Sequence, residues 1–144
     1  TAVHAATQYL DEGALDEDSV HEAVRPSLAE YRRFLTEMDV VILAIEEEVT
    51  HPTLGYRGRL DRRVRINGRE GIVDIKGIYR AEWQAIQLAG YAECFSPRRL
   101  ARWTLHLPSD GTSYRLIEHS QKGDRGVWLA ACTIAAWKVR NGIT

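Results

Sequence analysis

The residues with the clearest chemical potential are two aspartates and a lysine in the stretch LDRRVRINGREGIVDIK, residues 60–76. Asp61, Asp74 and Lys76 are charged side chains in segments that otherwise read as β-strands. Two carboxylates suit Mg²⁺ or Mn²⁺, and an ammonium group beside them can stabilise negative charge on a phosphoryl group. The three residues therefore predict a site that hydrolyses a phosphodiester, in which a bound metal polarises the phosphoryl oxygen and acidifies water.

A hairpin brings these three side chains together. The Asn-Gly pair at positions 67–68 is the strongest short signal for a two-residue turn. Such a turn pairs Ile66 with Arg69, and the same register puts Asp61 directly opposite Asp74. Opposed Cβ atoms lie about 4.5–5.5 Å apart, and like charges there are destabilising. A divalent cation between the carboxylates is one way to neutralise the pair.

Strand alternation divides the hairpin into a charged face and a core face. The charged face carries Arg59, Asp61, Arg63, Arg65, Ile72, Asp74 and Lys76, and the core face carries Leu60, Val64, Ile66, Val73 and Ile75. An alternative to the metal site follows from this arrangement. Arg59, Arg63 and Arg65 would neutralise the two aspartates in a surface ion-pair network, and the hairpin alone favours neither arrangement.

The pattern of the whole chain predicts an α/β fold, with a mixed central β-sheet flanked by helices. We expect helices at 1–10, 26–38, 82–95 and 126–142, and strands at 40–45, 56–66, 69–76, 102–107 and 113–119. The acidic run at 46–48 is expected to close the first strand. At 144 residues the chain is predicted to form a single domain, 1–144.

Charge is distributed unevenly along the chain. Residues 1–48 hold 12 acidic and 3 basic side chains, and residues 49–144 hold 8 acidic and 16 basic ones. A basic sector facing a polyanion explains this distribution, as does a solvated strand face laced with charge. The two cysteines are too few for a disulfide framework and predict buried free thiols in a reducing, intracellular compartment.

The motifs GRLD (58–61), VDIK (73–76) and QLAGY (87–91) together resemble the PD-(D/E)XK nuclease superfamily. The likeness is greatest to its RecB-like branch and to small phage exonucleases, and it covers nearly the whole chain. The resemblance implies a restriction-endonuclease-like αβββαβ core and metal-dependent cleavage of nucleic acid. The count of two cysteines excludes the iron–sulfur relatives of this branch, which need more.

The resemblance also implies roles for individual residues. Asp61, Asp74, the backbone carbonyl of Ile75 and His4, in the segment AVHAA, correspond to metal ligands. Lys76 corresponds to the catalytic lysine.

Further positions follow from the same resemblance. A glutamate of the first strand assists, and of Glu46, Glu47 and Glu48 we favour Glu46. Gln87 and Tyr91, four apart on one helical face, would line the cleft.

Arg59 and Arg63 would hold substrate phosphates. The chain departs from the pattern at Gly77, where the family usually has threonine after the lysine. It also begins immediately before the His4 motif, so an N-terminal segment of the family is predicted to be missing.

The leading hypothesis is thus a Mg²⁺- or Mn²⁺-dependent deoxyribonuclease, of the phage exonuclease type. We expect DNA as its partner, phage recombination or replication proteins as further partners, and the cytoplasm of a bacterial host as its location. One alternative is a module of the same fold that binds nucleic acid without cutting it. Another is a protein-interaction domain whose acidic segment, residues 11–18, docks a basic partner.

Overall fold

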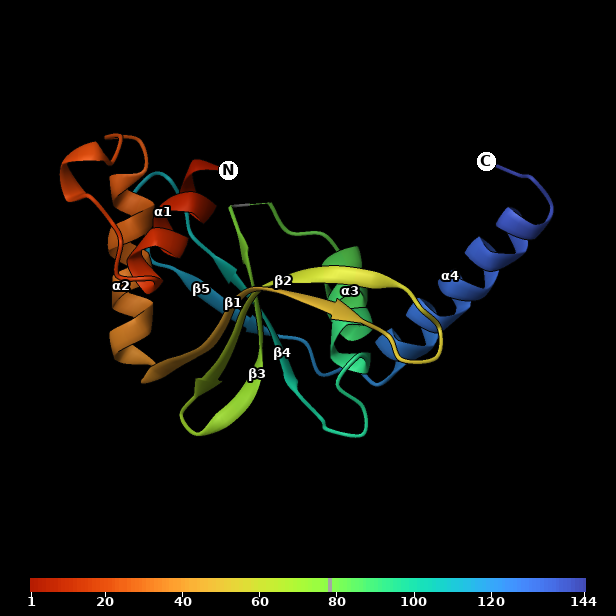
Figure 1. The fold of residues 1–144 in the computed structure, drawn as a ribbon. Coiled ribbons are helices and arrows are strands. Elements are labelled where there is room, and N and C mark those ends of the chain that lie inside the picture. Colours follow the sequence, from red (N-terminus) through yellow and green to blue (C-terminus); the bar gives the residue numbers. More distant parts are fainter. Residues whose placement is uncertain (78) are drawn as a thin grey trace.

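A five-stranded β-sheet lies between helices on its two faces in the computed structural model, which describes residues 1–77 and 79–144 (Figure 1). The elements in chain order are α1 (Ala2–Asp11), the 3₁₀ helix η1 (Glu17–Ser19), α2 (Arg25–Glu37), β1 (Val40–Thr50), β2 (Arg57–Ile66), β3 (Arg69–Lys76), α3 (Trp83–Glu93), β4 (Ala101–His106), β5 (Arg115–Glu118) and α4 (Gly123–Arg140). The predicted fold class and order of elements are confirmed, with η1 as an addition.

The sheet is mixed, and its strand order is β1-β2-β3-β4-β5. The pairs β1–β2, β2–β3 and β4–β5 are antiparallel, whereas β3 and β4 are parallel. Parallel neighbours need a crossover connection, and α3 provides it. The crossover takes the chain from the end of β3, where Lys76 lies, to the start of β4.

The predicted turn between β2 and β3 is confirmed. Asn67 and Gly68 both have positive φ, 47° and 82°, as a two-residue hairpin turn of this type requires. The pairing runs from Ile66–Arg69 to Arg62–Val73 in the predicted register. It ends there, one step before Asp61 and Asp74, so the prediction that these two residues form a ladder pair is wrong.

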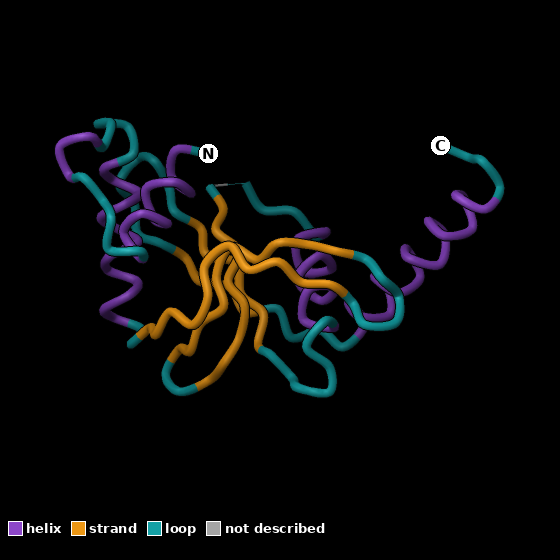
Figure 2. Tube along the Cα trace, viewed as in Figure 1, coloured by secondary structure: helices purple, strands orange, loops and turns teal. Residues whose placement is uncertain are grey.

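Strand β1 is longer than expected and runs to Thr50, so the prediction that the acidic run at 46–48 closes it is wrong. The run continues the strand because Glu47 and Glu48 form ion pairs with Arg63 and Arg59 of the neighbouring strand β2. Figure 2 shows both strands of this ribbon continuing to a loop beside α3.

The two faces of the sheet bury separate cores. On one face Tyr31 and Phe34 of α2 pack with residues of the central strands, among them Val64 and Ile75. On the other face Leu88 of α3 packs with Val49, Leu60 and Ile72.

The face predicted for Leu60 is therefore wrong, because its side chain packs beneath α3 with Ile72 instead of joining Val64 and Ile66. The β1–β2 ribbon bends across the sheet towards α3, which carries Leu60 over to that side (Figure 1). The face predicted to be charged is consequently covered in part by α3.

Helix α4 packs on α3 at its start and then runs away from the rest of the molecule (Figure 1). Several of its large apolar side chains are exposed, among them Ile134 at 57% and Trp137 at 49%. In the part of the chain that the structure describes, no helix combines the length and the apolar character needed to cross a membrane.

Cys94 and Cys132 are free but only half-buried, so their predicted full burial is wrong.

A buried arginine joins the helices to the sheet. Arg62 of β2 is 1% exposed, and its Nε donates a hydrogen bond to Asp11 Oδ2 at 2.6 Å. Its Nη1 donates to the Asp61 carbonyl at 2.7 Å, and its Nη2 donates to Thr7 Oγ1 at 3.3 Å. Tyr31 of α2 donates to the same Asp11 oxygen. Sequence reasoning missed this network, which fixes α1 against β2.

We predict that Asp11→Ala destabilises the fold by about 3–5 kcal/mol, because it leaves the buried Arg62 guanidinium without its carboxylate. Urea unfolding followed by circular dichroism measures this loss. The matched control is Arg32→Ala, which removes an exposed pair with Glu17 and should cost no more than about 1 kcal/mol. Equal losses in the two variants would contradict a structural role for the buried pair.

Candidate active site

The side chains of Asp61 and Asp74 meet where strands β2 and β3 separate. Asp61 Oδ2 accepts a hydrogen bond from the backbone N–H of Ile75 at 2.8 Å, so a side chain replaces the backbone acceptor at this point of the strand pair. The two carboxyl groups are close enough that each shifts the pKa of the other. The predicted proximity of the carboxylates is thus present, although strand separation rather than a ladder pair produces it.

His4 of α1 lies against the same carboxylate. Its Nε2 is 3.4 Å from Asp61 Oδ2, and its Nδ1 lies 2.6 Å from Thr1 Oγ1. His4, Thr7 and Asp11 are three and four residues apart and so share one face of α1. Because Arg62 holds Thr7 and Asp11, the same network directs His4 to Asp61.

Lys76 reaches the site from the end of β3. Its Nζ lies 2.9 Å from Asp74 Oδ2 and 5.5 Å from the centre of the Trp83 ring. The contact with Asp74 is an ion pair without hydrogen-bond geometry, which leaves the buried Oδ2 without a hydrogen-bond donor. Trp83 is 51% exposed, so about half of its surface is open to solvent beside Lys76.

The pKa values of the two aspartates are shifted in opposite directions. Burial raises the pKa of Asp74, and the neighbouring Asp61 raises it further, while Lys76 opposes this in part. Burial also acts to raise the pKa of Asp61, but hydrogen bonds from His4, Asp74 and the Ile75 amide outweigh it, and the net pKa is lowered. The hydrogen bond with Asp61 raises the pKa of His4 against the effect of burial. Such opposed shifts within one cluster are typical of functional sites.

Glu46 of β1 lies opposite Asp61 of the neighbouring strand β2, because the residues on either side of it, Ile45 and Glu47, pair with Arg62 and Leu60. Its φ of 49° is unusual for a residue with a side chain and marks a local irregularity in the strand. Its carboxylate lies 3.7 Å from Arg62 Nη1, the group that donates to the Asp61 carbonyl.

The neighbouring glutamates at 47 and 48 point to arginines of β2 instead. Of the three glutamates, Glu46 is thus the one that lies by Arg62, whose Nη1 donates to the Asp61 carbonyl.

The two residues predicted to line the cleft differ in position. The charges of Asp74 and Asp61 contribute, after burial, to a raised pKa of Tyr91, so its hydroxyl senses both carboxylates. Its ring lies against Gly58, where any side chain would collide with it. Gln87 is half-buried on the same helix, and the hydrogen bonds of the described residues include none from its side chain to the aspartates.

The predicted phosphate-binding arginines are engaged elsewhere. Arg59 pairs with Glu48 at 2.7 Å, and Arg63 pairs with Glu47 and Glu70, each at 2.9 Å. The alternative in which arginines neutralise the aspartates does not match these contacts, because the partners that the structure gives Asp61 and Asp74 are His4 and Lys76.

Lys76 is followed by Gly77 instead of the family's usual threonine, and residues of the neighbouring strand β4 hold this end of β3. The Gly77 carbonyl accepts a hydrogen bond from His106 Nδ1 at 2.9 Å, and His106 Nε2 lies 3.2 Å from Thr104 Oγ1. Both side chains are buried, so the strand end that carries Lys76 is anchored from the neighbouring strand.

The cluster suits a divalent cation in part. Its ligands would be the carboxylates of Asp61 and Asp74, and the buried Asp74 Oδ2 has a lone pair to offer. Among residues 1–77 and 79–144, no set of three His, Cys, Asp or Glu side chains is arranged as a ready metal cage. Mg²⁺ typically binds one or two carboxylates and keeps several waters, so two aspartates fit that mode of binding. A cavity of about 230 Å³ is lined by His4 and Lys76, the two residues that contact the aspartates, and by Ile75, but the aspartates themselves are not part of its lining.

No protein-family model and no curated protein matches this chain. A solved structure named "Putative exonuclease", from Eubacterium rectale, superposes with a TM-score of 0.64. The superposition covers 99% of this chain and 67% of that one, at 14% sequence identity. A second structure, named SSO0001, covers 94% of this chain and 73% of its own at 18% identity, with a TM-score of only 0.41. The first similarity shows that the chain shares the fold of that structure.

We predict that the metal-free protein loses stability as pH rises from about 4 towards the raised pKa of Asp74. The unfolded chain releases this proton near its ordinary pKa of about 3.9, whereas the folded protein retains it, so rising pH favours unfolding. Asp74→Asn should remove much of this loss and stabilise the fold above neutral pH by about 1–3 kcal/mol, since one pKa unit corresponds to about 1.4 kcal/mol.

Urea unfolding in EDTA across a pH series measures both effects. Asp18→Asn, at an exposed aspartate, is the matched control and should follow the wild-type curve. A wild-type stability that does not fall with rising pH would show that the two carboxyl groups are not forced together.

Proposed function

We propose that the chain is a Mg²⁺- or Mn²⁺-dependent nuclease of the PD-(D/E)XK superfamily that hydrolyses phosphodiester bonds of DNA. The observation that carries the proposal is the convergence of His4, Asp61, Asp74 and Lys76 from three different elements. The sequence motifs imply a metal site made by these four residues, and their contacts together with the nuclease-like fold support the proposal.

The carboxylates of Asp61 and Asp74 would hold the divalent cation, with His4 and the Ile75 carbonyl beside them. When bound, the ion supplies a Lewis acid for the phosphoryl oxygen and lowers the pKa of a coordinated water. The hydrogen bond from the Ile75 amide fixes the orientation of the Asp61 carboxylate. His4, held by Thr1 and Asp61, limits the movement of that carboxylate on its other side.

Lys76 would act on the reacting groups themselves. Its ammonium can donate hydrogen bonds to the attacking water and to a non-bridging phosphoryl oxygen, where negative charge grows in the transition state. Asp74 and the Trp83 ring hold the ammonium at the site, and the bond from His106 to Gly77 steadies the strand end behind it. Tyr91 would line the substrate side of the cleft.

Exonuclease action, a phage-type role with recombination or replication partners, and a location in the bacterial cytoplasm are finer parts of the same proposal. They rest on the sequence resemblance. End-labelled linear DNA and closed circular DNA, each incubated with Mn²⁺ and then with EDTA, separate exonuclease from endonuclease action. DNA binding without metal-dependent products would instead favour the module that binds without cutting.

We predict that Lys76→Ala lowers the rate of DNA cleavage by about 10²- to 10⁴-fold, because it removes a positioned proton donor and charge-stabilising group. Binding of DNA and the unfolding midpoint should change little, since Lys76 is only partly buried. Initial rates on labelled DNA with Mn²⁺ measure the effect.

Lys138→Ala, at an exposed lysine near the far end of α4, serves as the matched control and should cleave like wild type. Full cleavage by the Lys76→Ala variant would remove the lysine from the mechanism.

A further inference from the structure

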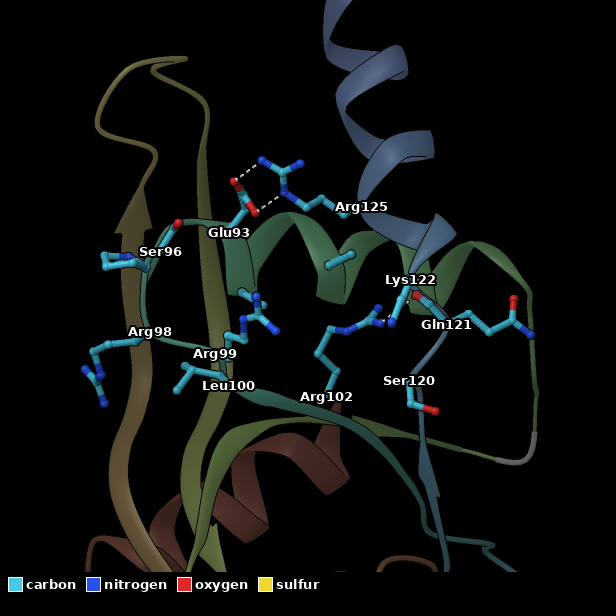
Figure 3. A pocket seen from close by; sticks show the side chains of 13 residues that line it. Glu93, Ser96, Arg98, Arg99, Leu100, Arg102, Ser120, Gln121, Lys122 and Arg125 are labelled. Atoms are coloured by element: carbon cyan, nitrogen blue, oxygen red, sulfur yellow. Dashed lines mark hydrogen bonds and ion pairs between the residues drawn. The ribbon is translucent and has the colours of Figure 1, made fainter.

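A second cavity lies away from the carboxylate pair, between the end of α3, the segment 96–100 and the start of α4 (Figure 3). Its volume is about 650 Å³. The basic side chains that line it are Arg98, Arg99, Arg102, Lys122 and Arg125, and Glu93 is the acidic residue of the lining. Five basic residues against one acidic residue give this lining four net positive charges.

Three of the arginines have structural partners. Arg102 is largely buried and ties α3 to α4, because it donates hydrogen bonds to the Ala85 carbonyl at 3.0 Å and to Asp124 at 2.9 Å. Arg125 forms a two-pronged pair with Glu93 at 2.7 and 2.8 Å, which Figure 3 shows at the rim. Arg98 pairs with Glu70 of β3.

Arg99 and Lys122 differ from these three. Both are exposed, and neither takes part in an ion pair among the residues that the structure describes. They face the cavity from opposite sides, one from the segment before β4 and the other from the start of α4 (Figure 3). Packing therefore does not account for their charges.

We propose that this cavity is a second phosphate-binding site, which holds the backbone of a nucleic-acid strand at a distance from the carboxylate pair. The inference rests on the proposed function for its choice of ligand. Arginine and lysine, together with the hydroxyl and amide groups of Ser96, Ser120 and Gln121, are the side chains that contact phosphates most often. No aromatic side chain is among the lining residues, so the site suits phosphates and not stacked bases.

The sheet gives the separation of the two sites. Arg102 pairs in register with Ile72, and Lys76 lies four residues further along β3. At about 3.3 Å per residue, the two positions are about 13 Å apart along the strand. A stacked nucleic-acid strand that advances about 3.4 Å per nucleotide needs about four nucleotides to cover this distance. A very small substrate can therefore occupy the carboxylate site alone.

The test is the double variant Arg99→Ala/Lys122→Ala, compared with Lys138→Ala/Arg140→Ala. Each removes one arginine and one lysine from exposed positions, and the control pair lies at the far end of α4. Fluorescence anisotropy with a labelled single-stranded oligonucleotide in EDTA measures binding at NaCl concentrations from about 50 to about 200 mM. Hydrolysis of bis(p-nitrophenyl) phosphate with Mn²⁺ measures the carboxylate site by itself.

We expect the double variant to bind the oligonucleotide several-fold more weakly at low salt. The slope of log K against log salt should fall by about 1.4, because each lost contact with a single strand removes about 0.7. Hydrolysis of the small diester should be unchanged, and the control variant should match wild type in both assays.

Two results would overturn the inference alone. One is a double variant that keeps the wild-type affinity and slope although the wild-type protein cleaves DNA. The other result concerns polyglutamate, a polyanion without phosphates. It would be that wild type binds polyglutamate and the double variant does not, while the double variant binds DNA as wild type does. A wild-type protein that neither binds nor cleaves DNA would overturn the proposed function, and with it the ligand assigned to this cavity.

Discussion

The close approach of a buried carboxyl group, Asp74, and a half-buried one, Asp61, is the constraint on which the site depends. Strands β2 and β3 stop pairing at Arg62 and Val73. Beyond that point the N–H of Ile75 donates its hydrogen bond to the Asp61 side chain and not to a backbone carbonyl. That exchange turns the carboxylate inward towards Asp74. Like charges this close in a buried place are costly, so the folded protein must keep a proton, recruit a cation, or do both in turn.

The rest of the architecture maintains this arrangement from a distance. Arg62 gathers Asp11, Thr7 and the Asp61 carbonyl into one buried network, so that α1 cannot shift without disturbing the strand that carries the aspartate. His4 reaches the site because it shares a helix face with the anchored residues. On the other face of the sheet, α3 packs on Ile72 and brings Tyr91 and Trp83 to the same end of the strands. A small core thus positions groups from α1, β2, β3 and α3.

Much of this could be read from the sequence, because local signals determine it. The Asn-Gly turn sets the register of the hairpin, and helical periodicity with Ser96-Pro97 places α3 and its end. What could not be read depends on tertiary contacts. Glu47 and Glu48 look like a strand end until arginines of β2 pair with them, and Leu60 changes faces because the ribbon bends over α3.

The buried Arg62 network had no local signal, since an arginine in a basic strand predicts a solvated side chain. The position of Trp83 over Lys76 depends on the path of the chain between β3 and α3, for which the intervening residues give no pattern. Sequence motifs thus identified the side chains that come into contact at the site, and the tertiary structure shows which contacts hold them there.

The most direct test of the central claim is calorimetric titration of the protein with Mn²⁺, without DNA. The account predicts saturable binding by the wild-type protein and by Asp18→Asn, and a loss of at least about tenfold in affinity in Asp61→Asn, because the variant removes one of two carboxylate ligands. Absence of saturable binding, or equal binding by Asp61→Asn and wild type, would contradict the claim that the paired carboxylates form a cation site.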